Sequence, residues 1–421
     1  MTDTTTRGAI EAVFRIESAR LLGGLVRMVR DVGLAEDLAQ EALVTALERW
    51  PATGVPENPG AWLMAAAKNR AIDHARRRRM IERKHESIAS ETADADLSGP
   101  EREDDVGDDL LRLVLVACHP VLSAEARVAL TLRLVGGLRT DEIARAFLIP
   151  EATLAQRIVR ARRTLTEARV PFEVPRGEEL IARLPSVLEV IYLIFNEGYA
   201  ATRGDDWVRH ELCDEALRLG RVLAGLVPDH AEVHGLVALM ELHASRARAR
   251  TGPSGEPVLL LEQDRSRWDQ LLIHRGLAAL ARAESLARPL GLYALQAAIV
   301  ACHARARTAD ATDWARIVAL YDALVELTQS PVVALNRAVA VGMAYGAAEG
   351  LELVDELIDE PALRAYHLVS SARGDLLFKL GRRDEARVEF ERAAALTQNT
   401  RERAALERRA GECGRGKLPR A

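Results

Sequence analysis

The sequence has little of what a disulfide-linked, zinc-binding or membrane protein requires. Its 421 residues include four cysteines, which lie about a hundred residues apart and never as Cys-x-x-Cys, so neither a disulfide framework nor a cysteine zinc site is expected. The most apolar run, residues 187–195, is far shorter than a membrane span. The first residues lack the basic and apolar segments of a signal peptide. We therefore expect a reduced, cytoplasmic protein with no membrane segment.

Motifs of enzymes and cofactor-binding proteins are also missing. The chain has no P-loop, no dinucleotide-binding glycine motif and no nucleophile elbow. His230 and His234 lie four residues apart, but no third metal ligand is placed with them. We therefore expect no enzymatic activity, no cofactor and no metal site.

Aromatic residues and lysine are scarce, whereas helix-forming residues are abundant. Aromatics make up only 4% of the chain, and stretches rich in Ala, Leu, Arg and Glu favour an all-α fold over sheets. Nearly all the basic residues are arginine, whose planar fork suits phosphates and base edges, although GC-rich codon usage gives the same excess. The net charge of −5 argues at first against a nucleic-acid binder, so the placement of the charges matters more than their sum.

Shifts in composition divide the chain into four parts. Residues 8–85 have helical periodicity and end in a basic run. Residues 86–109 hold ten acidic groups and one basic group, which predicts a disordered acidic linker. Helical periodicity returns over 110–170, and after two prolines a long series of helical stretches fills 176–421.

The last part carries a repeat-like pattern. Between residues 367 and 399, small residues and one aromatic follow the spacing of the tetratricopeptide (TPR) helical hairpin: Gly374, Gly381, Ala386, Phe390 and Ala393. Other hairpins upstream match only loosely. The pattern predicts a TPR-like domain of irregular helical repeats.

Residues 34–50 form an amphipathic pattern that, alone, is typical of an ordinary surface helix. Leu38, Ala42, either Thr45 or Ala46, and Trp50 are expected to face inward. The residues expected to face outward are Glu36, Asp37, Gln40, Glu41 and Glu48. A second helical stretch over 61–84 ends in four consecutive arginines, a density that suits phosphate binding better than it suits a solvated helix end.

Together these two stretches, LAEDLAQEALVTALERW and NPGAWLMAAAKNRAIDHARRRR, resemble region 2 of bacterial sigma factors of the extracytoplasmic-function (ECF) group. The resemblance implies that the first helix docks on the β′ clamp helices of core RNA polymerase, through Asp37, Gln40 and Glu41. It also implies that the second helix and the loop before it bind the −10 promoter element and hold a flipped base. The residues implied in −10 binding are Asn58, Asn69, Asp73, Arg76 and Arg77.

Residues 140–165 predict a helix-turn-helix. In its second helix, Leu154, Ile158, Ala161 and Leu165 repeat on one side and are expected to be buried, while a basic and polar face lies opposite. By itself this pattern also fits a basic surface helix of an all-α bundle.

The segment resembles sigma region 4 in Thr153-Leu154, Arg157 and Arg160-Ala161-Arg162, although Leu148 and Pro150 replace the usual turn glycine and capping serine. The resemblance implies contact with the β flap of polymerase and −35 binding by the following residues: Thr153, Gln156, Arg157, Arg160 and Arg163.

Further segments, among them LIFNEGY at 193–199 and EQDRSRWD at 262–269, resemble an ECF subgroup with a long TPR-like C-terminal extension. The resemblance implies that the extension regulates activity in place of a separate anti-sigma factor and binds an unknown protein or ligand. The candidate contact residues are Asn196, Glu197, Tyr199, Asp264, Arg265, Arg267 and Trp268.

Chain geometry is compatible with this interpretation. Promoter elements about 17 base pairs apart are separated by roughly 60 Å, and the 24-residue linker can extend to roughly 80 Å. Two alternatives stay open at this point: a helix-turn-helix regulator with a TPR sensor that binds DNA without replacing sigma, and a TPR scaffold whose N-terminal half is a docking platform.

Overall fold

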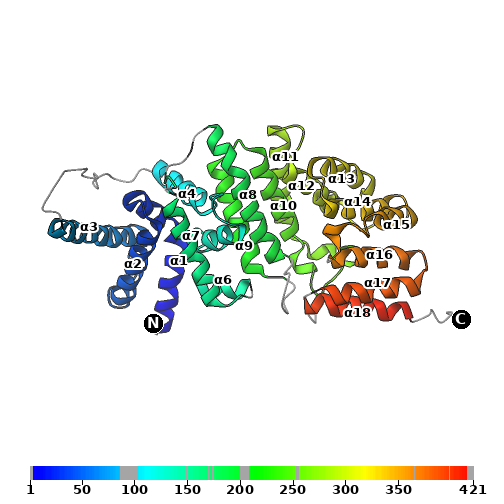
Figure 1. The fold of residues 1–421 in the computed structure, drawn as a ribbon, viewed down its shortest axis with the longest axis horizontal. Coiled ribbons are helices and arrows are strands. Elements are labelled where there is room, and N and C mark those ends of the chain that lie inside the picture. The colour runs from blue at the N-terminus through cyan, green and yellow to red at the C-terminus, as the bar shows by residue number, and fades with distance from the viewer. Residues whose placement is uncertain are drawn as a thin grey trace. The chain divides into compact units, whose positions relative to one another are not determined.

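The computed structural model describes residues 3–85, 103–147, 149–168, 170–172, 175, 177–199, 208–252, 256–364, 366–397 and 399–414. Across these ranges the regular elements are helices, with no strand among them, and the all-α prediction is confirmed (Figure 1). The chain forms two compact units, residues 1–193 and 194–421, which are described separately below. None of the helices in the described ranges combines the length and apolar character needed to cross a membrane.

The first unit begins with three long helices and continues through shorter ones. α1 packs against α2, α3 and α4, while α5, α6 and α7 pack on one another. The helices are α1 (Asp3–Val29), α2 (Val32–Thr53), α3 (Pro59–His85), α4 (Glu103–Ala117), α5 (Ala124–Leu134), α6 (Thr140–Ala146) and α7 (Glu151–Glu167). α8 (Glu178–Tyr199) runs from the first unit into the second.

The inward face of α2 is as the sequence predicts. Leu38, Ala42, Ala46 and Trp50 are buried. The helix starts at an Asp31 cap, whose side chain accepts a hydrogen bond of 2.8 Å from the backbone N–H of Leu34. Trp50 then meets Trp62 of α3 edge to face, with ring centroids 5.2 Å apart, so the indoles hold the two helices together.

The helix-turn-helix is also present. Leu154, Ile158, Ala161 and Leu165 of α7 are buried, as predicted, because their spacing places them on the side that meets α5 and α6.

The acidic linker ends earlier than predicted. α4 begins at Glu103, so residues 103–109 are helical, and residues 86–102 lie outside the described part of the chain. Asp109 is buried, pairs with Arg112 and lies 3.3 Å from the Arg27 guanidinium of α1. A Cβ at Gly23 would lie 2.9 Å from the Asp109 carbonyl oxygen, so the glycine lets α4 approach α1 closely. Composition overlooked this packing.

The second unit is a series of antiparallel helical pairs joined by short connections (Figure 1). Its helices after α8 are α9 (His210–Leu226), α10 (Ala231–Ala244), α11 (Gln270–Leu286), α12 (Leu292–Arg305), α13 (Trp314–Thr328), α14 (Pro331–Ala344), α15 (Ala347–Glu356), α16 (His367–Lys379), α17 (Arg383–Leu396) and α18 (Thr400–Gly414). Short 3-10 turns, η1 (Ala247–Ala249), η2 (Leu260–Glu262) and η3 (Arg265–Arg267), lie between α10 and α11, and η4 (Pro361–Leu363) precedes α16.

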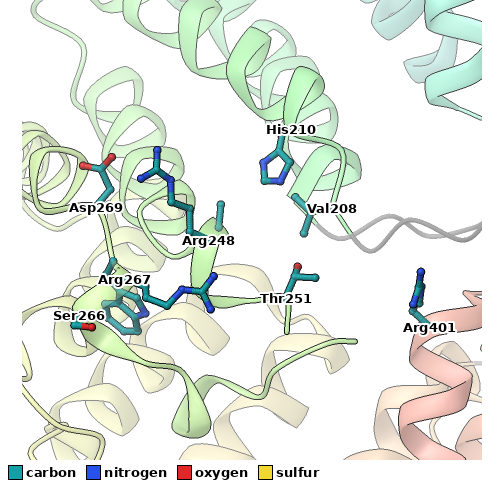
Figure 2. A pocket seen from close by; sticks show the side chains of 10 residues that line it. Val208, His210, Arg248, Thr251, Ser266, Arg267, Asp269 and Arg401 are labelled. Carbon is teal, nitrogen blue, oxygen red and sulfur yellow. The ribbon is translucent and has the colours of Figure 1, made fainter. Parts of the chain in front are cut away.

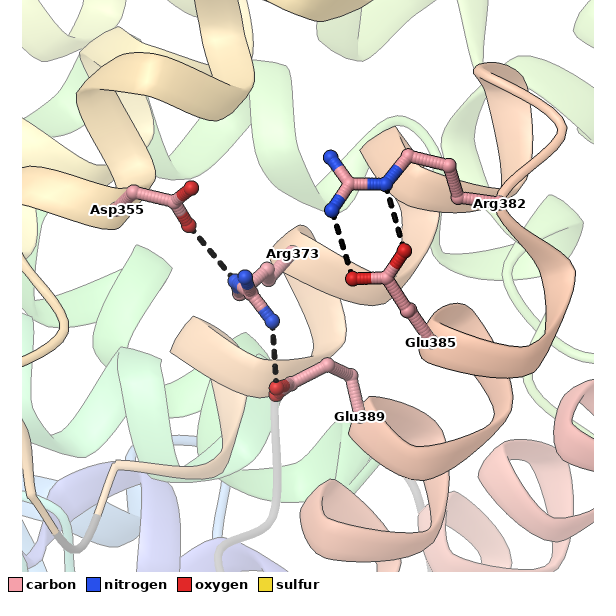
Figure 3. A network of polar contacts seen from close by, with 5 residues as sticks. All are labelled: Asp355, Arg373, Arg382, Glu385 and Glu389. Carbon is pink, nitrogen blue, oxygen red and sulfur yellow. Dashed lines mark hydrogen bonds and ion pairs between the residues drawn. The ribbon is translucent and has the colours of Figure 1, made fainter.

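The hairpin of α16 and α17 explains the spacing of small residues noted in the sequence. Phe390 is fully buried, and its ring would lie 2.9 Å from a Cβ at Gly374, so only glycine leaves room for it. Arg373 of α16 links the hairpin to α15, donating to Asp355 at 2.7 Å and to Glu389 at 2.8 Å (Figure 3). Assignment of the unit to the TPR family stays a prediction.

Candidate nucleic-acid interface

The outer face of α7 gathers most of the residues expected at the −35 element. Thr153, Gln156, Arg160 and Arg163 are exposed and recur at intervals of three and four residues, which aligns them along one side of the helix. Arg157 is half-buried at the edge of this face. The face is polar and basic, and it lies opposite the buried stripe. Such a helix face can enter the major groove and meet base edges.

Arg162 has a different role from its neighbours. Its guanidinium pairs with Glu36 of α2, and Arg133 of α5 donates to the other oxygen of the same carboxylate at 2.7 Å. Glu36 is only 5% exposed, so the prediction that it faces outward is wrong. Two arginines of the helix-turn-helix neutralise one buried carboxylate of the N-terminal helices, and this joins the two parts of the first unit.

Three of the residues expected at the −10 element lie along α3. Asn69, Asp73 and Arg76 are exposed and share one side of the helix, because they are separated by four and three residues. The Arg77 side chain lies outside the described residues, as do those of the remaining arginines of the run.

Asn58 lies at the other end of α3, about 16 Å from Asn69 along the helix axis, and has a structural task. Its side-chain oxygen accepts a hydrogen bond of 3.0 Å from the N–H of Ala61, which makes it the cap of α3, with Pro59 as the first helical residue. The Asn-Pro pair carried this signal in the sequence.

A pocket of about 190 Å³ opens beside this cap. Asn58, Ala61 and Met64 line it from the α3 side, Arg27 lines it from α1 and Asp109 from α4. The sequence did not indicate the α1 and α4 walls, because their residues are distant in the chain and come together only in the fold.

The outer face of α2 contains the residues expected to meet polymerase. Asp37 and Glu41 are exposed, Gln40 is half-buried, and Val44 on the same face is 52% exposed. Glu41 also pairs with Arg70 of α3 at 3.0 Å, in contact with solvent. The face is therefore acidic with an apolar centre, a composition that suits a protein partner with basic residues.

Comparison with known protein families assigns three segments. Residues 14–80 match Sigma-70 region 2, and residues 112–165 match Sigma-70, region 4. Residues 183–284 match DUF6596, a family of unknown function.

Two relatives are sigma factors. An RNA polymerase sigma-H factor of Pseudomonas aeruginosa is 33% identical over 162 residues, which are 36% of this chain and 81% of that protein. A probable ECF RNA polymerase sigma factor, SigI, of Mycobacterium tuberculosis is 32% identical over 177 residues, which are 41% of this chain and 60% of that protein. The chain belongs to the ECF group of sigma-70 factors.

Membership of this family assigns the sigma factor a role in starting transcription, which is not an enzymatic activity, and confirms the resemblance noted in the sequence. An uncharacterized protein of Rhizobium meliloti is 44% identical over 407 residues, which are 96% of this chain and 95% of that protein. Its likeness continues through the extension, so the sigma domains and the extension occur together in both proteins.

Proposed function

We propose that this sigma factor binds core RNA polymerase and directs it to promoters through −10 and −35 elements, while its C-terminal extension regulates that activity. The observation that carries the proposal is the outer face of α7, where Thr153, Gln156, Arg160 and Arg163 are exposed in line. Arginine reads guanine and glutamine reads adenine in the major groove, so this face has the chemistry needed for −35 recognition. Arg157 completes the proposed set at its edge.

The acidic face of α2 is the proposed contact with the β′ clamp helices. Asp37, Gln40 and Glu41 would supply polar contacts around the exposed Val44. An apolar centre within a charged rim is the usual arrangement of a protein–protein contact. The helix-turn-helix would meet the β flap.

The α3 helix is the proposed −10 site. Asn69, Asp73, Arg76 and Arg77 would follow the DNA strand along the helix, and Asn58 would lie at the pocket that accepts a flipped base. Since the Asn58 side-chain oxygen caps α3, its amide N–H groups are the part that can meet a base.

Binding both elements at once requires the first unit to open. The Glu36 pairs with Arg133 and Arg162 hold the two sigma domains together, whereas promoter elements lie roughly 60 Å apart. If α4 stays helical, the 17 residues 86–102 extend to at most about 60 Å, so they span this distance only when nearly fully extended.

The test is run-off transcription with purified core polymerase, the full chain and promoters selected from a random DNA pool. The proposal predicts specific transcripts that depend on the chain, and Asp37→Lys should reduce polymerase binding at least tenfold. Glu407→Lys makes the same charge change on an exposed residue of α18 and should have no effect. Specific DNA binding without polymerase, and no transcript with it, would favour the helix-turn-helix regulator instead.

A further inference from the structure

The extension contains an open pocket of about 700 Å³ that lies wholly within the second unit. Its walls come from chain segments far apart in sequence: His210 begins α9, Arg248 lies in η1, Arg267 ends η3, and Arg401 lies in the first turn of α18. Figure 2 shows these side chains around one opening, with Arg401 on the far side from Arg267. The volume is large enough for a small molecule of roughly nucleotide size.

The charge of the lining is mainly positive. Three guanidinium groups line the pocket, against one carboxylate, that of Asp269. The Asp269 carboxylate accepts hydrogen bonds from the N–H groups of Leu271 and Leu272, at 2.9 and 3.1 Å, so it caps α11. Arg248 and Arg267 are exposed, and neither forms an ion pair with an acidic residue among the described residues. These two arginines are therefore available to an anion.

The wall behind the pocket also carries positive charge. Trp268 lines the pocket and is 4% exposed, and its indole N–H has no hydrogen-bond partner within the described part of the chain. The guanidinium of Arg265 lies 4.5 Å from the Trp268 ring centroid, and that of the buried Arg246 lies 5.9 Å from it. Arg246 donates to the Tyr199 hydroxyl at 2.9 Å and contacts His243 Nδ1 at 2.7 Å, both of them neutral groups.

Two nearby histidines respond to this charge. Burial, together with Arg246 and Arg265, lowers the pKa of His303 to about 4. Burial, Arg246 and Arg250 likewise hold the pKa of His243 well below its ordinary value. Both imidazoles are therefore neutral at pH 7, and the positive charge of the arginines is not shared with them. Three helices, α9, α11 and α18, also begin at the pocket, and their N-terminal N–H groups favour a negative ligand.

We propose that this pocket binds a small phosphorylated molecule. Arginine forks match the oxygens of a phosphate group in pairs, and Ser266, Thr251 and the unpartnered indole N–H of Trp268 supply neutral hydrogen-bonding groups. The exposed Arg248 and Arg267 hold the phosphate, and Arg401 closes the ring of charge from α18. The proposal concerns the extension alone and does not depend on polymerase or DNA binding.

The test is isothermal titration calorimetry on the full chain at constant ionic strength, with inorganic phosphate, pyrophosphate and AMP as probes. We expect one saturable site for at least one phosphate probe. The double variant Arg248→Gln/Arg267→Gln should weaken that binding at least tenfold, and Ser266→Glu should weaken it by placing a negative charge at the opening. Arg392→Gln/Arg408→Gln removes two exposed arginines of α17 and α18 and should leave binding unchanged.

Three results would overturn the proposal. The first is the absence of saturable heat with every phosphate probe. The second is an equal loss of binding in both double variants, which would indicate a diffuse basic surface. The third is equal or tighter binding of citrate than of pyrophosphate, because it would assign the pocket to carboxylates. Since the titration needs no polymerase, its result is independent of the transcription experiment.

Discussion

Arginine is used in opposite ways in the two units. On α7 of the first unit, Arg160 and Arg163 extend into solvent on the proposed DNA face. In the second unit, Arg246 is buried, and the partly buried Arg265 donates to the backbone oxygens of His303 and Ala306 at 2.5 and 2.8 Å. The same residue type therefore recognises a ligand in one unit and joins helix ends in the other. An arginine-rich composition alone does not distinguish these uses, because the difference lies in the acceptors that the fold provides.

The largest expected effect separates a structural arginine from a binding one. Arg265→Ala leaves two carbonyl oxygens at the end of α12 without their charged donor, so the second unit should lose about 3–5 kcal/mol of unfolding free energy. Urea unfolding measures this loss. Arg267→Ala, two residues away and exposed, should leave stability nearly unchanged. Equal losses in the two variants would contradict the distinction.

A second prediction uses pH. His303 has a pKa of about 4 in the folded chain and about 6.5 when unfolded, so the unfolded state binds more protons between these values. Its contribution is fully present above pH 6.5 and falls as the pH drops, by about 2 kcal/mol at pH 5. Urea unfolding at pH 7.5 and pH 5 measures the change. His303→Asn should reduce the pH dependence, and His274→Asn, on the exposed side of α11, should not.

A third prediction concerns the exposed arginines. Arg160→Ala should weaken binding of the polymerase–sigma complex to a selected promoter by about 1–3 kcal/mol, roughly tenfold to a hundredfold, by removing a base contact. Polymerase association and urea unfolding should stay as in the parent chain, and Arg392→Ala serves as the exposed control. If Arg160→Ala instead abolished polymerase binding, this face of α7 would meet the enzyme and not the DNA.

The smallest effect is expected at Arg163, which pairs with Glu167 in an exposed i,i+4 contact of 2.6 Å. Arg163→Ala should leave stability unchanged, because exposed pairs contribute little. If the arginine meets a phosphate, the slope of log Kd against log salt should fall by about 1, with similar loss on every sequence. A change in sequence preference would show that Arg163 reads a base.

The sequence predicted what depends on local periodicity. The buried stripe of α7 and the inward residues of α2 follow the helical repeat, so spacing alone located them. Glu36 was misplaced because its burial depends on Arg133 and Arg162, about a hundred residues away in the chain. Its spacing from the buried Val32 and Ala39 did place it on a second inward stripe, but its charge suggested the opposite.

Long-range contacts also account for the other differences. The acidic composition of residues 103–109 predicted disorder, yet Asp109 packs on α1 beside two arginines, and the neighbouring glycines Gly23 and Gly24 were the local signal of that close approach. The walls of the extension pocket run from Val208 to Arg401, and no local pattern could bring them together. Resemblance to a family had singled out Arg267 and Trp268 before the pocket itself was visible.

The buried Glu36 also bears on how much polymerase the factor needs. When the competent form is only a fraction of the population, the apparent affinity falls by that fraction, about fivefold for each 1 kcal/mol that favours the joined arrangement. Because breaking a buried pair from one side costs about 3–5 kcal/mol, even the lower value would leave fewer than about one molecule in a hundred open. A single carboxylate would thereby set the threshold concentration of polymerase at which the factor begins to compete.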